Sequence, residues 1–217
     1  MTPPLKTAGG GCGNPILYEH EGCKNWVWVE ETCKSMWCAQ CAAKRQVRIA
    51  KSVRREVMGW RSPTHVVLTM RNMPGLRYMV RKFERAWRRF GRSTWFRRLF
   101  PIGVWAVGLT VGQDEKWHYH MHIAAERSVR WVSPGELQAR WSKAVGERAF
   151  TSVASRKAGV LAREISLGTK HDWASLRAGA EKSIAFRDIV EGALKGKRLW
   201  GAWGGASPKL ERAAAFC

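Results

Sequence analysis

The segment Trp117-His118-Tyr119-His120-Met121-His122-Ile123 places a histidine at every second position of a short hydrophobic run. Alternation with period 2 is typical of a β-strand, in which the side chains at i, i+2 and i+4 leave the same face. We therefore expect a strand with three imidazoles on one face and hydrophobic side chains on the other. Because imidazole is a common ligand of divalent ions, this face predicts a metal site. A strand that merely exposes a polar histidine face would show the same pattern.

The charge of the chain is strongly positive. Its 217 residues include 38 Lys and Arg against 17 Asp and Glu, which gives a formal net charge of +21. A charge this large exceeds what solubility requires and indicates a polyanionic partner. The sequence also has 13 tryptophans. Most are expected in the core, and a minority could stack on the bases of a single strand.

Neither a membrane span nor a signal peptide is predicted. No stretch reaches the ~20 apolar residues that a span requires, and the first residues lack the basic and then apolar order of a signal peptide. We therefore expect a cytoplasmic protein without a membrane partner, in which cysteines stay reduced and available to metal.

Five of the six cysteines lie near the start of the chain: Cys12, Cys23, Cys33, Cys38 and Cys41. The last three have the spacing C-x4-C-x2-C, which lets a tight turn present thiolates to one tetrahedral ion. Cys23 is the expected fourth ligand, whereas Cys12 or His20 could replace it or complete a different set. The cluster predicts a zinc site with a structural role. Buried cysteines without metal are the alternative.

The remaining periodicity predicts a mixture of strands and helices. We expect strands over 25–31, 64–70, 104–111, 118–125 and 159–166, the third and fourth of which form a hairpin. We expect helices over about 42–59, 76–91, 133–146 and 175–194. Residues 195–205 predict a basic, glycine-rich loop.

Two segments are expected to bind nucleic acid. The helix over 76–91 is apolar on one side, and cations crowd the rest of its surface. Such dense like charge is relieved by a polyanion or by solvent, so a solvated basic face is the alternative. The candidate contacts are Arg77, Arg81, Lys82, Arg85, Arg88 and Arg89 in this helix, and Lys195, Lys197 and Arg198 in the loop.

In combination, these motifs resemble the HUH-type rolling-circle replication initiators of plasmids and phages. Leu68-Thr69 matches the end of the family's first motif, and His120-Met121-His122 matches the second. His118 matches a frequent additional histidine, and residues 195–205 look like a basic, aromatic run found late in such proteins. The cysteine-rich start is also similar to that of related single-strand transposases.

The resemblance implies an α+β fold with a central antiparallel sheet flanked by helices (HUH/RRM-like) and a small zinc-binding element. It implies that His118, His120 and His122 hold Mg or Mn, which polarises a phosphodiester of single-stranded or hairpin DNA. A tyrosine then attacks to give a 5′-phosphotyrosyl intermediate, so that a strand is nicked and rejoined at the origin of a mobile element. A host helicase is a further possible partner. The expected parts are a lead-in, a zinc element with a basic helix, a nuclease domain and a tail: 1–11, 12–59, 60–205 and 206–217.

The chain departs from the family at the nucleophile, because no tyrosine follows Tyr119. Leu167, Gly168 or Phe186 stands where the third-motif tyrosine is expected. Tyr78 is the remaining candidate, since neighbouring cations would lower the pKa of its phenol and attract a phosphate; an exposed surface tyrosine is the alternative. A nicking enzyme, a hydrolytic nuclease that uses water, and a nucleic-acid-binding protein without activity therefore all remain open.

Overall fold

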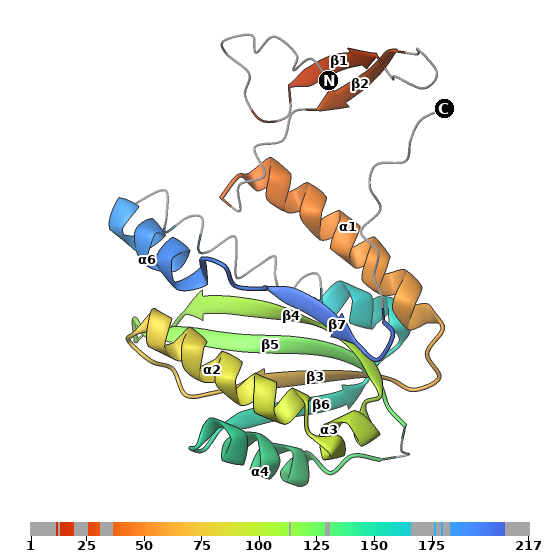
Figure 1. Cartoon of the computed structure of the whole chain (residues 1–217), viewed down its shortest axis with the longest axis vertical. Coiled ribbons are helices and arrows are strands. Elements are labelled where there is room, and N and C mark those ends of the chain that lie inside the picture. The colour runs from red at the N-terminus through yellow and green to blue at the C-terminus, as the bar shows by residue number, and fades with distance from the viewer. Residues whose placement is uncertain are drawn as a thin grey trace.

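The computed structural model describes residues 12, 14–19, 26–30, 37–112, 114–128, 131–165, 176, 179 and 183–206. Within them lie a two-stranded sheet and a five-stranded sheet with helices on both faces, which is an α+β architecture (Figure 1). No helix in these ranges is long and apolar enough to cross a membrane.

The five-stranded sheet has the order β6-β3-β5-β4-β7, and every neighbouring pair is antiparallel. Its strands are β3 (Pro63–Thr69), β4 (Ile102–Val111), β5 (Trp117–Glu126), β6 (Phe150–Ser155) and β7 (Trp200–Trp203). The predicted hairpin is confirmed as β4 and β5. The strand that carries the three histidines therefore lies at the centre of the sheet, paired on both sides.

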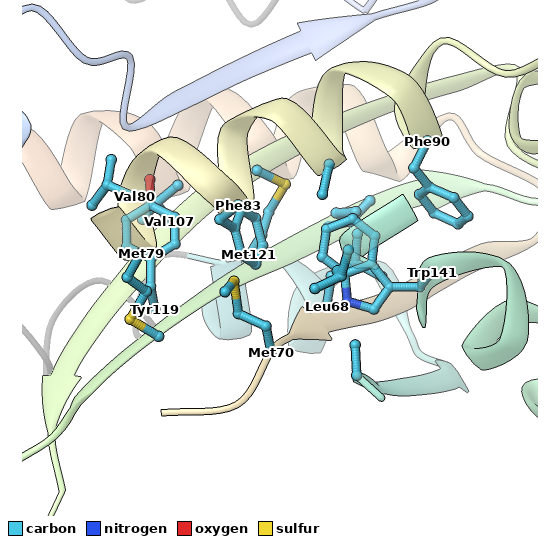
Figure 2. Close-up of a cluster of buried hydrophobic side chains, with 14 of the residues drawn as sticks. Leu68, Met70, Met79, Val80, Phe83, Phe90, Val107, Tyr119, Met121 and Trp141 are labelled. Atoms are coloured by element: carbon cyan, nitrogen blue, oxygen red, sulfur yellow. The ribbon is translucent and has the colours of Figure 1, made fainter. Parts of the chain in front are cut away.

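The alternation predicted for the central strand is confirmed. In β5, Trp117, Tyr119, Met121 and Ile123 are buried, and the histidines between them are half-buried. The buried face packs against α2 (Leu76–Gly91), α3 (Thr94–Leu99) and α4 (Pro134–Val145) in the main core. Figure 2 shows Phe83 of α2 facing Tyr119 and Met121 of β5, beside Trp141 of α4.

Local signals fix the ends of the helices on this face. Helix α2 spans the predicted range, and its apolar side is buried. Helix α4 begins as predicted, since the Ser133 hydroxyl accepts from the Glu136 backbone N–H and Pro134 occupies the first turn. The Trp141 indole N–H then donates to the Thr69 carbonyl at 2.7 Å, which joins α4 to the end of β3.

Two helices cover one end of the histidine face. Ile49, Val53 and Val57 of α1 (Ala39–Met58) pack with the helix over 158–165. Together they cover three small side chains of this face, which are Val104, Ala106 and Ala124. Because Ala124 follows His122 on the same face of β5, the covered end lies next to the histidines and leaves them half-buried.

The prediction of a strand over 159–166 is wrong, because residues 158–165 are helical. Leu161, Ala162 and Ile165 are buried together, with the i, i+1, i+4 spacing of a helix face. The run is short and apolar, so its periodicity alone does not separate strand from helix. The strand in this part of the chain is β6, which ends before the helix begins.

Two further boundaries differ from the sequence prediction. Helix α6 (Ile184–Leu194) begins after Ser183, whose extended backbone and cap to the Phe186 N–H separate it from the helical residues 176 and 179. A single helix over 175–194 is therefore wrong. The predicted loop over 195–205 contains an edge strand, β7, which pairs with β4.

The amino-terminal strand is confirmed as β2 (Trp26–Glu30), paired with β1 (Pro15–Glu19) in a separate antiparallel sheet. Trp26 and Trp28 of this hairpin are exposed.

Glycine at position 201 is required by packing. A Cβ there would lie 2.8 Å from the Trp105 ring, whereas a Cβ on Gly159 meets nothing within 4 Å. We expect Gly201→Ala to lower the free energy of unfolding by about 1–3 kcal/mol through overpacking. Gly159→Ala, the matched control, should raise the free energy of unfolding by roughly 0.5–1 kcal/mol, because residue 159 lies in a helix. Chemical denaturation measures both changes, and equal stability of the two variants would contradict this packing.

Candidate functional site

Four histidines share one face of the sheet. His65 of β3 joins His118, His120 and His122 of β5, because His65 pairs with Ala124 and antiparallel partners leave a sheet on the same side. The His65 and His122 rings stack with centroids 5.3 Å apart, and His65 Nε2 lies 3.1 Å from His122 Nδ1. Successive histidines of β5 have centroids 4.9 and 5.0 Å apart. The predicted face is thus present, with a fourth imidazole that sequence analysis did not include.

A carboxylate lies behind this group. Glu164, from the helix over 158–165, places Oε2 3.0 Å from His65 Nδ1 and Oε1 3.4 Å from Arg156 Nε. The carboxylate favours the His65 tautomer with its proton on Nδ1, because two lone pairs would repel. In that tautomer His65 Nε2 accepts from His122 Nδ1–H, so the lone pair of His122 lies on its Nε2. Such partners are typical of histidines that bind metal.

The electrostatics keep these rings neutral. Burial lowers the pKa of His122 from 6.5 to about 3, and His120 and His65 lower it further. Burial also lowers the pKa of His65; Glu164 partly offsets this effect, and Arg156 adds to it. Because a metal ligand must be the neutral imidazole, His65 and His122 are in the form that binds metal at neutral pH.

The cysteine cluster is the most closely gathered set of ligands. Among the described residues, only Cys12, Cys38 and Cys41 have ligand atoms all within 4.8 Å of one another, and the Cys12 and Cys41 sulfurs are 3.1 Å apart. They lie close enough to hold a metal ion, which is compatible with zinc. No three ligand atoms of the histidine face are gathered this closely in the described structure.

The start of α1 positions the cysteines. Cys38 is the N-cap residue of α1, and Cys41 is buried in its first turn. The neighbouring Trp37 indole N–H donates to Glu191 of α6, which anchors this segment to the carboxyl-terminal part of the chain. Cys12, predicted only as an alternate, belongs to the cluster. Cys23, Cys33 and His20 lie outside the described residues.

The candidate nucleophiles are not brought to the histidines. Tyr78 is exposed on α2, which packs on the opposite face of the sheet (Figure 1). Tyr119 is buried in the core, as expected, and burial together with Glu84 raises the pKa of its phenol. Phe186 stacks on Trp117, with ring centroids 5.3 Å apart. Leu167 and Gly168 lie outside the described residues.

The predicted basic residues divide between solvent and internal partners. In α2, Arg77, Arg81, Arg85 and Arg88 are exposed, but Arg89 donates to the Ala144 carbonyl and Lys82 pairs with Glu147 at 2.8 Å. Lys195 and Arg198 are exposed, and Lys197 pairs with Glu84 at 2.5 Å. The cations on the side of the histidines belong instead to α1 and to its neighbours, and include Arg48, Lys51, Arg54, Arg55, Arg156 and Lys157.

His65 and Glu164 are the site residues that sequence analysis missed. His65 stands two and four positions before Val67 and Thr69, so period 2 places it on the face that those residues share. Period 2 alone does not say whether His65 lies on the side of the β5 histidines or on the side of its buried residues, because this depends on the register between β3 and β5. Glu164 lies within the predicted strand over 159–166, so its position on a helix was not expected.

Comparison with known proteins adds no relative. A scan against protein-family models, a search of curated proteins and a search of solved structures each returned no match. The resemblance to HUH-type initiators therefore rests on the sequence motifs, namely Leu68-Thr69, the histidine run over 118–122 and the cysteine-rich start.

The buried histidines predict a pH dependence of stability. Both shifts are downward, so between about pH 6.5 and pH 3 the unfolded chain binds more protons than the folded chain. The free energy of unfolding should fall as the pH is lowered through this window. Denaturation at a series of pH values, with a chelator present, should show a flatter slope for His122→Asn than for the wild type. Parallel slopes would contradict the burial of a neutral His122.

The cysteine cluster predicts a metal-dependent amino-terminal segment. Replacing Cys41 by Ser should remove the bound metal and lower the melting temperature, because binding free energy at such a site is folding free energy. Elemental analysis of the purified protein measures the metal, and Gln40→Ala, which changes an exposed side chain of the same helical turn, is the control. Equal metal content in the two variants would contradict the site.

Proposed function

We propose that the chain is a metal-dependent endonuclease that nicks and rejoins single-stranded DNA, in the manner of HUH-type replication initiators at the origin of a mobile element. The observation that supports this most directly is the histidine face. Four imidazoles and Glu164 lie together on one face of a central antiparallel sheet, and burial keeps His65 and His122 neutral by lowering the pKa of each. A protein that only binds nucleic acid has no use for such a set.

His118, His120 and His122 would hold Mg or Mn, the ions of the family that the motifs resemble. Bound there, the ion would polarise a phosphodiester and stabilise the negative charge that develops on its oxygens. His65 and Glu164 orient His122 through the 3.1 Å and 3.0 Å contacts. In the cysteine cluster we propose zinc with a structural role, because thiolates that fill the coordination shell leave no position for substrate.

The basic surface would bind the strand. Helix α1 lies on the side of the histidines, and Arg48, Lys51, Arg54 and Arg55 are all on its surface and exposed. Each phosphate contact releases counterions, so affinity should depend steeply on salt. The cations of α2 lie across the sheet and would contact a different part of the nucleic acid.

Water is the second candidate nucleophile, and the placement of the tyrosines favours it. Tyr119 points to the core, and Tyr78 belongs to the helix on the opposite face. Attack by water on the same phosphodiester would make the protein a hydrolytic nuclease without a covalent intermediate. Binding without cleavage is the third outcome.

A denaturing gel separates these three outcomes. The full-length protein is incubated with a pool of single-stranded oligonucleotides and Mn or Mg. A band shifted by covalently attached protein supports tyrosine attack, and mass spectrometry of the adduct identifies the residue. Cleavage without an adduct supports water. Absence of cleavage, with salt-sensitive binding, would overturn the proposed activity.

Substitutions test whether the histidine face is responsible. His120→Ala and His122→Ala should abolish cleavage and leave DNA affinity within a few-fold, because affinity comes mainly from Lys and Arg. Glu164→Gln should lower the cleavage rate about 10–100-fold, as expected for a group that orients a metal ligand. Glu136→Gln, an exposed carboxylate of α4 on the opposite side, is the matched control. Loss of binding in step with cleavage would contradict a catalytic metal.

A further inference from the structure

A cavity of about 440 Å³ lies on the face of the sheet opposite the histidines. Residues of α2, of β4 and β7, and of the turn over 196–198 line it, so it opens at the β7 edge (Figure 1). Its volume falls within the range of roughly 300–1,000 Å³ that is typical of small-molecule sites. The proposed nuclease activity makes no use of it.

Three tryptophans of this cavity, Trp87, Trp105 and Trp203, each lie against a glycine. Trp105 pairs across the strands with Gly201, and Trp203 pairs with Gly103, so each indole covers the bare backbone of the neighbouring strand. Trp87 covers Gly91 in the same way, where a Cβ would lie 2.9 Å from its ring. The Trp87 and Trp105 rings are half-buried, with centroids 6.3 Å apart. The wall is therefore aromatic, rigid and in part accessible.

The rim of the cavity is strongly positive. Arg88, Arg92, Arg97, Lys197 and Arg198 line it, and the only carboxylate among its lining residues is Glu84, which is paired with Lys197. Arg97 is held in place, since its Nε donates to the Gly91 carbonyl at 2.6 Å and its guanidinium lies 5.3 Å from the Trp203 ring centre. Burial lowers the pKa of Arg97, and the positive charge of the nearby Arg92 adds to this effect.

We propose that this cavity binds a nucleoside phosphate, with the base against Trp105 and Trp87 and the phosphate on Arg92 and Arg97. An aromatic wall beside a cluster of guanidinium groups fits both parts of such a ligand, because bases stack on indole rings and phosphates pair with arginine. The ligand is either one nucleotide of a bound single strand, in which case the inference rests on the proposed function, or a free nucleotide.

Isothermal titration of the full-length protein with deoxyadenosine 5′-monophosphate tests this proposal. Arg92→Gln should weaken binding about tenfold, because it removes a charged phosphate contact. Trp105→Leu should weaken it on the order of tenfold by removing a stacking surface. Lys143→Gln, which changes an exposed cation of α4 that does not line the cavity, should leave binding unchanged. Since Arg92 is exposed and caps α2, its variant is expected to fold even if Trp105→Leu does not.

Inorganic phosphate and a single-stranded oligonucleotide complete the experiment. Phosphate that binds as tightly as the nucleotide would overturn the role of the base. Absence of nucleotide binding, or equal binding by Arg92→Gln and Lys143→Gln, would overturn the site. If Arg92→Gln also weakens oligonucleotide binding, the ligand is part of a strand; if oligonucleotide binding is unchanged, it is a free nucleotide.

Cleavage is measured separately on the same preparations. Cleavage without nucleotide binding would overturn this inference alone, and nucleotide binding without cleavage would overturn the proposed nuclease alone.

Discussion

The register of β5 is the constraint on which both faces of the molecule depend. The strand pairs with β3 on one side and β4 on the other, and its side chains alternate without interruption between core and imidazole over residues 117–123. A slip of one residue against either neighbour would move three histidines into the core and expose Tyr119, Met121 and the residues beside them. The packing of α2 and α4 therefore stabilises the arrangement of the histidines as well as the fold, because it fixes which alternate residues of β5 face the core.

Burial then determines the chemistry of the histidine face. An imidazole that is partly removed from water loses more hydration free energy as the cation than as the neutral ring, so the pKa of His122 falls far below neutrality. Neutral rings can approach one another closely, as the 3.1 Å distance between His65 Nε2 and His122 Nδ1 requires. Glu164 brings a carboxylate into contact with His65, and its pairing with Arg156 moderates its effect on that ring. His65 and His122 therefore need no deprotonation before a cation binds.

Local patterns predicted the elements well, and the contacts between distant segments poorly. The alternation of β5, the apolar side of α2 and the Ser133 cap of α4 are all contained in windows of a few residues, and all three are confirmed. The His65–Glu164 pair joins β3 to a helix 99 positions later in the chain, and no local pattern specifies that approach. The cysteines show the same limit, since Cys12 lies 29 positions before Cys41 and spacing alone could not choose it over Cys23 or His20. The helix over 158–165 was missed because a short apolar run satisfies both periods.

The distribution of charge links the two faces of the sheet. The chain has 38 basic and 17 acidic residues, so its acids are too few to pair with all of its cations. Pairs such as Lys82–Glu147 and Lys197–Glu84 join two segments of the chain and hold a helix or a turn in place. Exposed cations lie on α1, on the side of the histidines, and on α2, on the opposite side. The mutual repulsion of like charges at this density destabilises the compact state, and counterions or a polyanion reduce this repulsion. Cations on both faces of the sheet form a larger positive surface than a single nucleic-acid-binding groove would need. In the proposed function, a single strand would pass the histidines and continue round the short β7 edge, where Trp105, Trp203 and Arg97 line the cavity.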